Sequence, residues 1–159
     1  MKKIILIFAL LLAVCFVTPA RAQVDTSAKQ AIVVDAGTGT VLFEKNANEH
    51  MPTSSMSKVM TMYMVFEALK QGRLHLNDEL LVSEKAWREG MDGGSRMFIQ
   101  VGTKVKVEDL IRGVIVQSGN DASIALAEGI AGTEDAFVET MNARAKDLGL
   151  NDSHFMNAD

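Results

Sequence analysis

The chain has 159 residues, of which 48% are hydrophobic and 23% are charged, and it carries a formal net charge of -4. This length is enough for one domain with a buried core, and the composition excludes an intrinsically disordered chain. The acidic balance and the lack of a basic stripe argue against nucleic acid as a partner.

Residues 1–22 have the pattern of a secretory signal peptide. Two lysines precede an unbroken apolar run over residues 4–17, and Ala20-Arg21-Ala22 places small residues at the two positions that a signal peptidase reads. The run is too short to predict a stable membrane span, and the alternative is an uncleaved N-terminal anchor. We expect an exported protein of the periplasm or cell envelope, cleaved after Ala22. Cleavage removes three basic residues and no acidic one, which changes the net charge from -4 to -7.

Cysteine and histidine usage argues against disulfides and metal. Cys15 is the only cysteine and lies within the apolar run, so the mature chain is predicted to lack disulfides. His50, His75 and His154 are scattered without the spacing of metal ligands. We therefore expect no metal and no other cofactor.

The first elements predicted after the signal peptide are two strands, at residues 31–35 and 40–44. Both are rich in β-branched residues, and the turn at residues 36–39 contains two glycines. This pattern predicts a β-hairpin.

The rest of the chain is predicted to be helical, with helices over residues 54–71, 84–88, 107–116, 120–127 and 133–148. Residues 74–82 and 90–95 are expected to be turns and loops. The first helix is apolar nearly all round, so we expect it inside the protein. Asn120 and Asp121 are expected to cap the fourth helix, and Gly149 is expected to end the last one.

The predicted hairpin has too few partners. A lone hairpin is only marginally stable in water, and no strand pattern follows Gly129. We therefore expect residues 23–159 to be the N-terminal portion of a domain whose other strands lie beyond Asp159.

Ser55-Met56-Ser57-Lys58 places a serine and a lysine three residues apart at the start of the first predicted helix. That spacing brings both side chains to one helix face. Serine needs a nearby base to act as a nucleophile, and burial favours the neutral amine that can serve as one. The alternative is a helix cap followed by a solvated lysine.

Ser118-Gly119-Asn120 lies between two predicted helices. A hydroxyl and a carboxamide on either side of a glycine can both point into one cleft. Ser118 could pass a proton from the lysine to a leaving amine, and Asn120 could hold a substrate amide. The alternative is a glycine turn in which Asn120 only caps a helix.

A Ser-x-x-Lys followed about sixty residues later by a Ser-x-Asn resembles the superfamily of penicillin-binding proteins and serine β-lactamases. More specifically, the chain resembles the low-molecular-weight D-alanyl-D-alanine carboxypeptidases over residues 31–157. Four stretches carry the resemblance in order: the hairpin, residues 55–61, residues 94–98 and residues 117–122. Gly119, the middle residue of the Ser-x-Asn motif, separates the chain from the class A β-lactamases, which have aspartate at this position of the motif.

The resemblance implies an α/β fold in which an antiparallel sheet packs against a helical cluster, with only the first hairpin and the helical part present here. It implies Ser55 as nucleophile, Lys58 as base, Ser118 as a further catalytic residue and Asn120 as a substrate-binding residue. The implied reaction removes the terminal D-alanine from a peptidoglycan pentapeptide through an acyl-serine intermediate. β-Lactams would acylate the same serine.

The family's third motif, Lys-Thr-Gly on a strand, does not occur up to Asp159, so we expect the 159-residue chain alone to have no appreciable activity. Some members of the family associate with the membrane through a C-terminal segment, which is not present here. The alternatives to a carboxypeptidase are a β-lactamase or D,D-endopeptidase of the same superfamily and a truncated, inactive protein.

Overall fold

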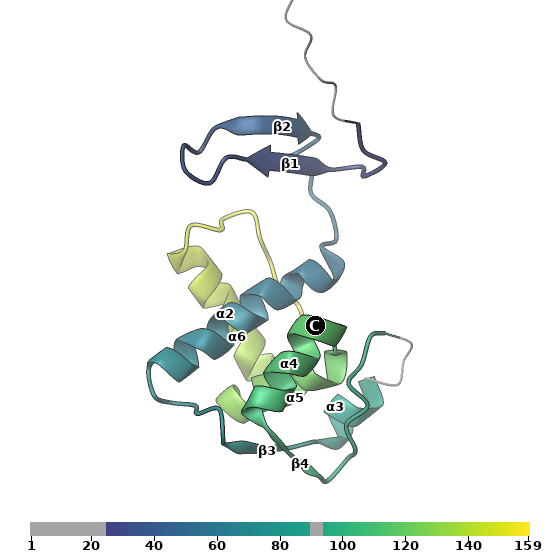
Figure 1. The fold of residues 1–159 in the computed structure, drawn as a ribbon. Helices are drawn as coiled ribbons and strands as arrows, with labels where there is room; N and C mark the ends of the chain where they lie inside the picture. The colour runs from purple at the N-terminus through teal and green to yellow at the C-terminus, as the bar shows by residue number, and fades with distance from the viewer. Residues whose placement is uncertain (1–24, 90–93) are drawn as a thin grey trace, which may run out of the picture. The chain divides into compact units, whose positions relative to one another are not determined.

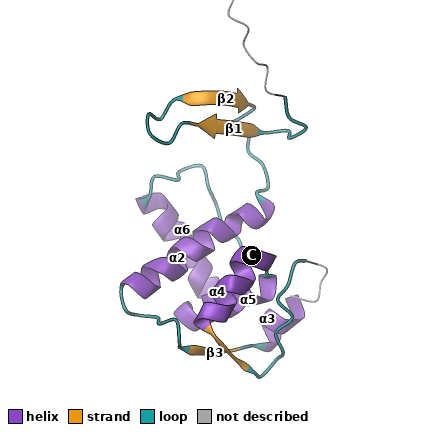
Figure 2. Cartoon of the chain, viewed as in Figure 1, coloured by secondary structure: helices purple, strands orange, loops and turns teal. Residues whose placement is uncertain are grey.

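The computed structural model describes residues 25–89 and 94–159 and divides into two compact units, Met1–Met51 and Pro52–Asp159 (Figure 1; Figure 2). The expected signal peptide and residues 90–93 of an expected loop lie outside the described residues.

The described part of the first unit is a β-hairpin. Strand β1 (Ala31–Val34) pairs antiparallel with β2 (Val41–Lys45), with Val33 opposite Phe43 and an irregularity after Val33. This confirms the predicted hairpin to within one residue at each strand end. Both strands expose apolar side chains, namely those of Ile32, Val33, Val34, Val41 and Leu42.

The turn of the hairpin is organised by Asp35. Its Oδ1 accepts hydrogen bonds from the Thr38 hydroxyl and the Thr38 amide, each over 2.7 Å, and from the Gly37 amide over 3.1 Å. These bonds, that of the Thr38 hydroxyl first, lower the pKa of Asp35. Gly39 follows at φ 72°, a left-handed conformation that glycine adopts without a steric penalty.

The second unit is a cluster of helices with one small sheet. Its elements in chain order are the 3-10 helix η1 (Ser54–Ser57), α2 (Lys58–Lys70), β3 (Glu79–Leu81), α3 (Glu84–Glu89), β4 (Lys104–Lys106), α4 (Val107–Gln117), α5 (Asn120–Ala131) and α6 (Glu134–Asp147). The five predicted helices are confirmed, and α5 runs four residues further than predicted. The strands β3 and β4 pair antiparallel and were not predicted.

Helix α5 is the centre of the second unit. It packs against α2, α3, α4, α6 and β3, and residues 121–127 are all buried (Figure 1). Most of its residues are small or apolar, which lets four helices approach one axis. At Gly129 the approach is so close that a Cβ atom would lie 2.4 Å from Leu80 Cδ1.

Helix α2 is only half covered by the described residues. Its inner face is buried and includes Met60, Met64 and Val65. Val59 is 74% exposed and Phe66 48% exposed on the opposite face. The expectation of a helix buried on all sides is therefore wrong for this structure, because only one face of α2 packs against α5 and α6.

Candidate active site

Ser55 and Lys58 form a hydrogen-bonded pair where η1 passes into α2. Ser55 is exposed, whereas the side chain of Lys58, the first residue of α2, is only 5% exposed. Lys58 Nζ lies 3.2 Å from Ser55 Oγ and donates to it. The predicted pairing of the two side chains is confirmed, and it joins a sheltered amine to a hydroxyl that solvent can reach.

The burial of Lys58 shifts its ionisation towards the neutral form. Burial lowers the pKa of Lys58 from the ordinary 10.5, because water no longer solvates the ammonium, while the nearby Asp159 carboxylate opposes this effect. Burial also raises the pKa of Asp159 itself. A neutral amine at this place can accept the Ser55 proton, which is the property that a general base requires.

The C-terminal segment is held along the buried side of α2. Thr61 Oγ1 donates to the carbonyl of Ala158 over 2.7 Å, and the Ala158 amide donates to Glu134 Oε1 over 2.8 Å. Ser57 Oγ lies 2.7 Å from the carbonyl oxygen of Asp159. These contacts explain why a carboxylate lies near Lys58. No residue pattern predicts these contacts, because their acceptors include main-chain carbonyls.

Ser118 and Asn120 flank the junction of α4 and α5. Ser118 is the C-cap residue that follows α4, and its φ of 54° and ψ of 35° are a left-handed conformation that costs a non-glycine residue about 1–3 kcal/mol. Ser54, next to the other motif, has φ 47°. Strain of this kind persists only where the surroundings impose it, and it occurs often at functional sites.

Asn120 is the first residue of α5, and its side chain does not cap the helix; Gly119 is the N-cap residue. The prediction that Asn120 and Asp121 cap α5 is therefore wrong. The backbone N–H of Asn120 donates to the Ser95 carbonyl over 2.8 Å. A Cβ at Gly94 would lie 2.5 Å from Asn120 Nδ2, so the glycine leaves the space that this carboxamide occupies.

The structure brings Ser55 and Lys58 into contact, but it does not join this pair directly to Ser118 and Asn120. Helix α5, which begins at Asn120, packs against α2. Among the described residues no hydrogen bond links Ser118 or Asn120 to Ser55 or Lys58.

Asp121, which is predicted to cap α5, is a buried acid. It is 2% exposed, and its carboxylate accepts hydrogen bonds from the amides of Met97, Ile99 and Ala122. An aspartate in the first turn of a helix is so common that its sequence position carries no signal of this contact.

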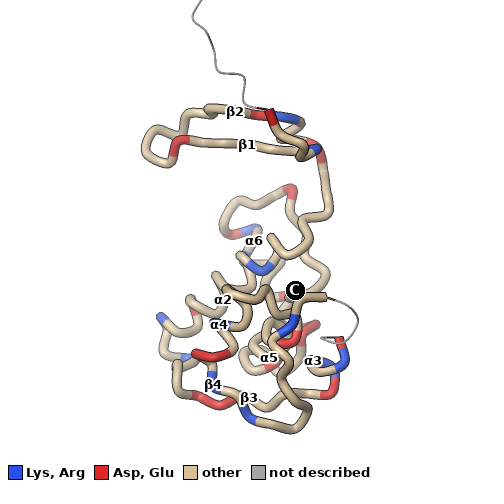
Figure 3. Tube along the Cα trace, turned by 45° about the vertical axis from the view of Figure 1, so that its right-hand side comes forward, with Lys and Arg blue, Asp and Glu red and all other residues tan. Residues whose placement is uncertain are grey.

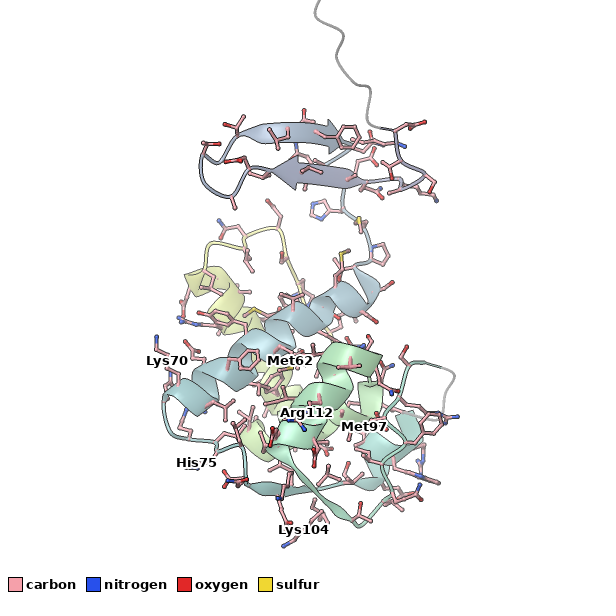
Figure 4. The ribbon with its side chains drawn as sticks, viewed as in Figure 1. Met62, Lys70, His75, Met97, Lys104 and Arg112 are labelled. Atoms are coloured by element: carbon pink, nitrogen blue, oxygen red, sulfur yellow. The ribbon has the colours of Figure 1, made fainter. Side chains whose placement is uncertain are left out.

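A surface hollow of about 430 Å³ is lined by Met97, Ile99, Val105, Asp109, Arg112, Gly113, Val116 and Gln117. Figure 4 labels Met97 and Arg112 of this lining. Charges of both signs are interspersed along the helical unit (Figure 3). In the part of the chain that the structure describes, no set of three or more His, Cys, Asp or Glu side chains is placed to hold a metal ion. None of the described helices combines the length and the hydropathy that a membrane span requires.

Comparison with known proteins gives a consistent result. The family model described as D-alanyl-D-alanine carboxypeptidase matches residues 17–159. D-alanyl-D-alanine carboxypeptidase DacC of Escherichia coli (strain K12) is 44% identical over 134 residues, which are 82% of this chain and 34% of that protein. D-alanyl-D-alanine carboxypeptidase DacF of Bacillus subtilis (strain 168) is 42% identical over 130 residues, which are 82% of this chain and 33% of that protein.

Among solved structures, penicillin binding protein 5 from Haemophilus influenzae matches with a TM-score of 0.82 and 39% identity. The match covers 87% of this chain and 40% of that one. The expected fold class, an α/β fold of the D,D-peptidase type, is thereby confirmed. The chain spans about a third of the length of the curated relatives that it matches.

Proposed function

Because the chain belongs to the D-alanyl-D-alanine carboxypeptidase family, we propose that it supplies the nucleophile and the base of a serine D-alanyl-D-alanine carboxypeptidase. The substrate is the pentapeptide of peptidoglycan, and the product is the same peptide without its terminal D-alanine. One observation carries the proposal: the buried amine of Lys58 lies 3.2 Å from the exposed hydroxyl of Ser55.

The chemistry follows from that contact. Ser55 Oγ attacks the carbonyl carbon of the penultimate D-alanine, and neutral Lys58 accepts the hydroxyl proton. The C–N bond to the terminal D-alanine breaks as Ser118 gives its hydroxyl proton to the departing amine and receives in its place the proton that Lys58 took from Ser55. Water then attacks the acyl-serine ester, which releases the shortened peptide and restores the Ser55 hydroxyl.

The remaining roles extend this proposal. The Asn120 carboxamide binds an amide of the substrate backbone, and β-lactams acylate Ser55 in place of the peptide. Export of the protein, with cleavage after Ala22, brings it to the cell-wall substrate. Residues 23–159 are the N-terminal portion of the peptidase domain.

The test uses the gene product that carries this sequence. Incubation with fluorescent penicillin is expected to give one covalent label, which peptide mapping assigns to Ser55, and incubation with pentapeptide is expected to release D-alanine. Ser55→Ala is expected to abolish both, whereas Ser54→Ala removes a neighbouring hydroxyl and should retain both. Rapid hydrolysis of penicillin without D-alanine release would favour the β-lactamase alternative, and labelling at another serine would overturn the assignment of Ser55.

The rate of penicillin acylation is expected to rise with pH along the deprotonation of Lys58. Because burial lowers the pKa of Lys58, the midpoint should fall below 10.5. The Asp159 carboxylate favours the ammonium, so Asp159→Asn should move the midpoint to lower pH. Acylation rates measured between about pH 6 and pH 10 check both directions, and an unchanged midpoint in Asp159→Asn would contradict this account.

The lowered pKa of Lys58 also determines whether its contribution to the free energy of unfolding rises or falls with pH. Between the folded and unfolded pKa values of Lys58, the unfolded chain binds more protons than the folded one. The contribution of Lys58 to the free energy of unfolding therefore increases as pH rises through this window towards 10.5.

A further inference from the structure

Segment Gly94–Ile99 lies against the second serine motif. The Ser95 carbonyl accepts a hydrogen bond from the backbone N–H of Asn120 over 2.8 Å. A Cβ atom at Gly119 would lie 3.1 Å from the Met97 amide nitrogen, so only glycine permits this approach without displacement. The position of the segment and that of the motif are therefore coupled.

The carboxylate of Asp121 holds this segment in a strained conformation. Its Oδ1 accepts a hydrogen bond from the backbone amide of Met97 over 2.9 Å, and its Oδ2 accepts one from the backbone amide of Ile99 over 3.2 Å. Phe98 lies between these two amides with φ 65°, which a bulky residue rarely adopts. Two amides turned towards one anion in this way form an anion-binding concavity of the backbone, and here the anion is a side chain of the same protein.

We propose that Asp121 is a positioning residue for the reaction proposed above. Its carboxylate clamps Gly94–Ile99 against the start of α5, and the clamped segment fixes the orientation of Ser118 and Asn120. Asp121 is itself 2% exposed and is surrounded by backbone amides, so it acts through the motif and does not touch substrate. This inference rests on the proposed function for its catalytic consequence, but the clamp is a property of the free protein.

The variant that tests the clamp is Asp121→Asn. Asparagine keeps the volume of the side chain but presents an NH₂ donor where an oxygen accepted a backbone amide. Hydrogen bonds to charged groups are strong enough that their loss should accelerate amide exchange at Met97 or Ile99 by about ten- to a hundredfold. Ile124→Val is the matched control, because Ile124 is fully buried on the same helix and its side chain belongs to the hydrophobic core.

Hydrogen exchange and kinetics are measured on the gene product at a temperature where circular dichroism shows both variants fully folded. In Asp121→Asn we expect faster exchange in residues 97–99, unchanged exchange in α6, a higher KM for pentapeptide and a kcat/KM lowered at least about tenfold. In Ile124→Val, exchange in residues 97–99 and KM should stay at the wild-type values. A general loss of folded protein would lower kcat without changing KM.

Two outcomes would overturn the proposal. Unchanged exchange at both Met97 and Ile99 would show that no clamp exists. Faster exchange with wild-type KM and kcat/KM would show a clamp without a role in catalysis. If the unmodified protein neither binds penicillin at Ser55 nor releases D-alanine, the proposed function fails and the catalytic role of Asp121 fails with it, while the exchange data still report the clamp.

Discussion

Arginine in place of Lys58 is expected to lower the rate at which penicillin acylates Ser55 by about 10²- to 10⁴-fold, the usual contribution of a general base. The amine of Lys58 can act as a base because burial lowers its pKa. A guanidinium stays protonated even when buried, so it can donate to Ser55 Oγ but cannot take its proton. The measurement is the second-order rate of labelling with fluorescent penicillin.

Lys70→Arg is the matched control for this prediction. Lys70 is the last residue of the same helix and is exposed, so the identical substitution there leaves the Ser55 contact untouched (Figure 4). We expect labelling at the wild-type rate in this control. A Lys58→Arg protein that is acylated within tenfold of the wild-type rate would remove Lys58 from the role of base, and another group would then have to accept the Ser55 proton.

The first half of the site could be predicted because it depends on local geometry alone. A spacing of three residues at the start of a helix brings two side chains together whatever the rest of the fold does, and the structure confirms this for Ser55 and Lys58. The burial of Lys58 could be predicted because the helix that it begins has an apolar sequence. The exposed outer face, with Val59 and Phe66, could not be predicted, since the sequence is apolar on both sides.

The second half of the site depends on contacts between distant segments, which leave little trace in a sequence. Asp121 accepts hydrogen bonds from two backbone amides that lie 22 and 24 residues earlier in the sequence. Every non-proline residue has such an amide, so no residue type marks the partner. The small sheet was missed for a related reason: β3 and β4 have three residues each, and their pairing links Leu80 to Val105 across the whole α3 region.

Removal of the Phe137 ring should produce the largest loss of stability in the helical unit. Phe137 is 1% exposed on α6 and belongs to an apolar cluster that joins α6 to Met60 and Met64 of α2 and to Ala158. Phe137→Ala leaves a cavity that these neighbours cannot fill, and changes of this kind cost about 3–5 kcal/mol. Urea denaturation followed by circular dichroism measures the difference in free energy of unfolding.

Phe66→Ala tests whether this cost depends on burial. The same atoms are removed, but Phe66 is 48% exposed on the outer face of α2, so the change in free energy of unfolding should stay within about 0.5–1 kcal/mol. Equal losses in the two variants would contradict the burial of Phe137 within this cluster or show that further protein covers the outer face of α2.

Because Ala158 belongs to the Phe137 cluster and Asp159 follows it, Phe137→Ala should also loosen the carboxylate near Lys58. A lower midpoint in the pH dependence of acylation, in the direction expected for Asp159→Asn, would then connect the packing of α6 to the basicity of Lys58.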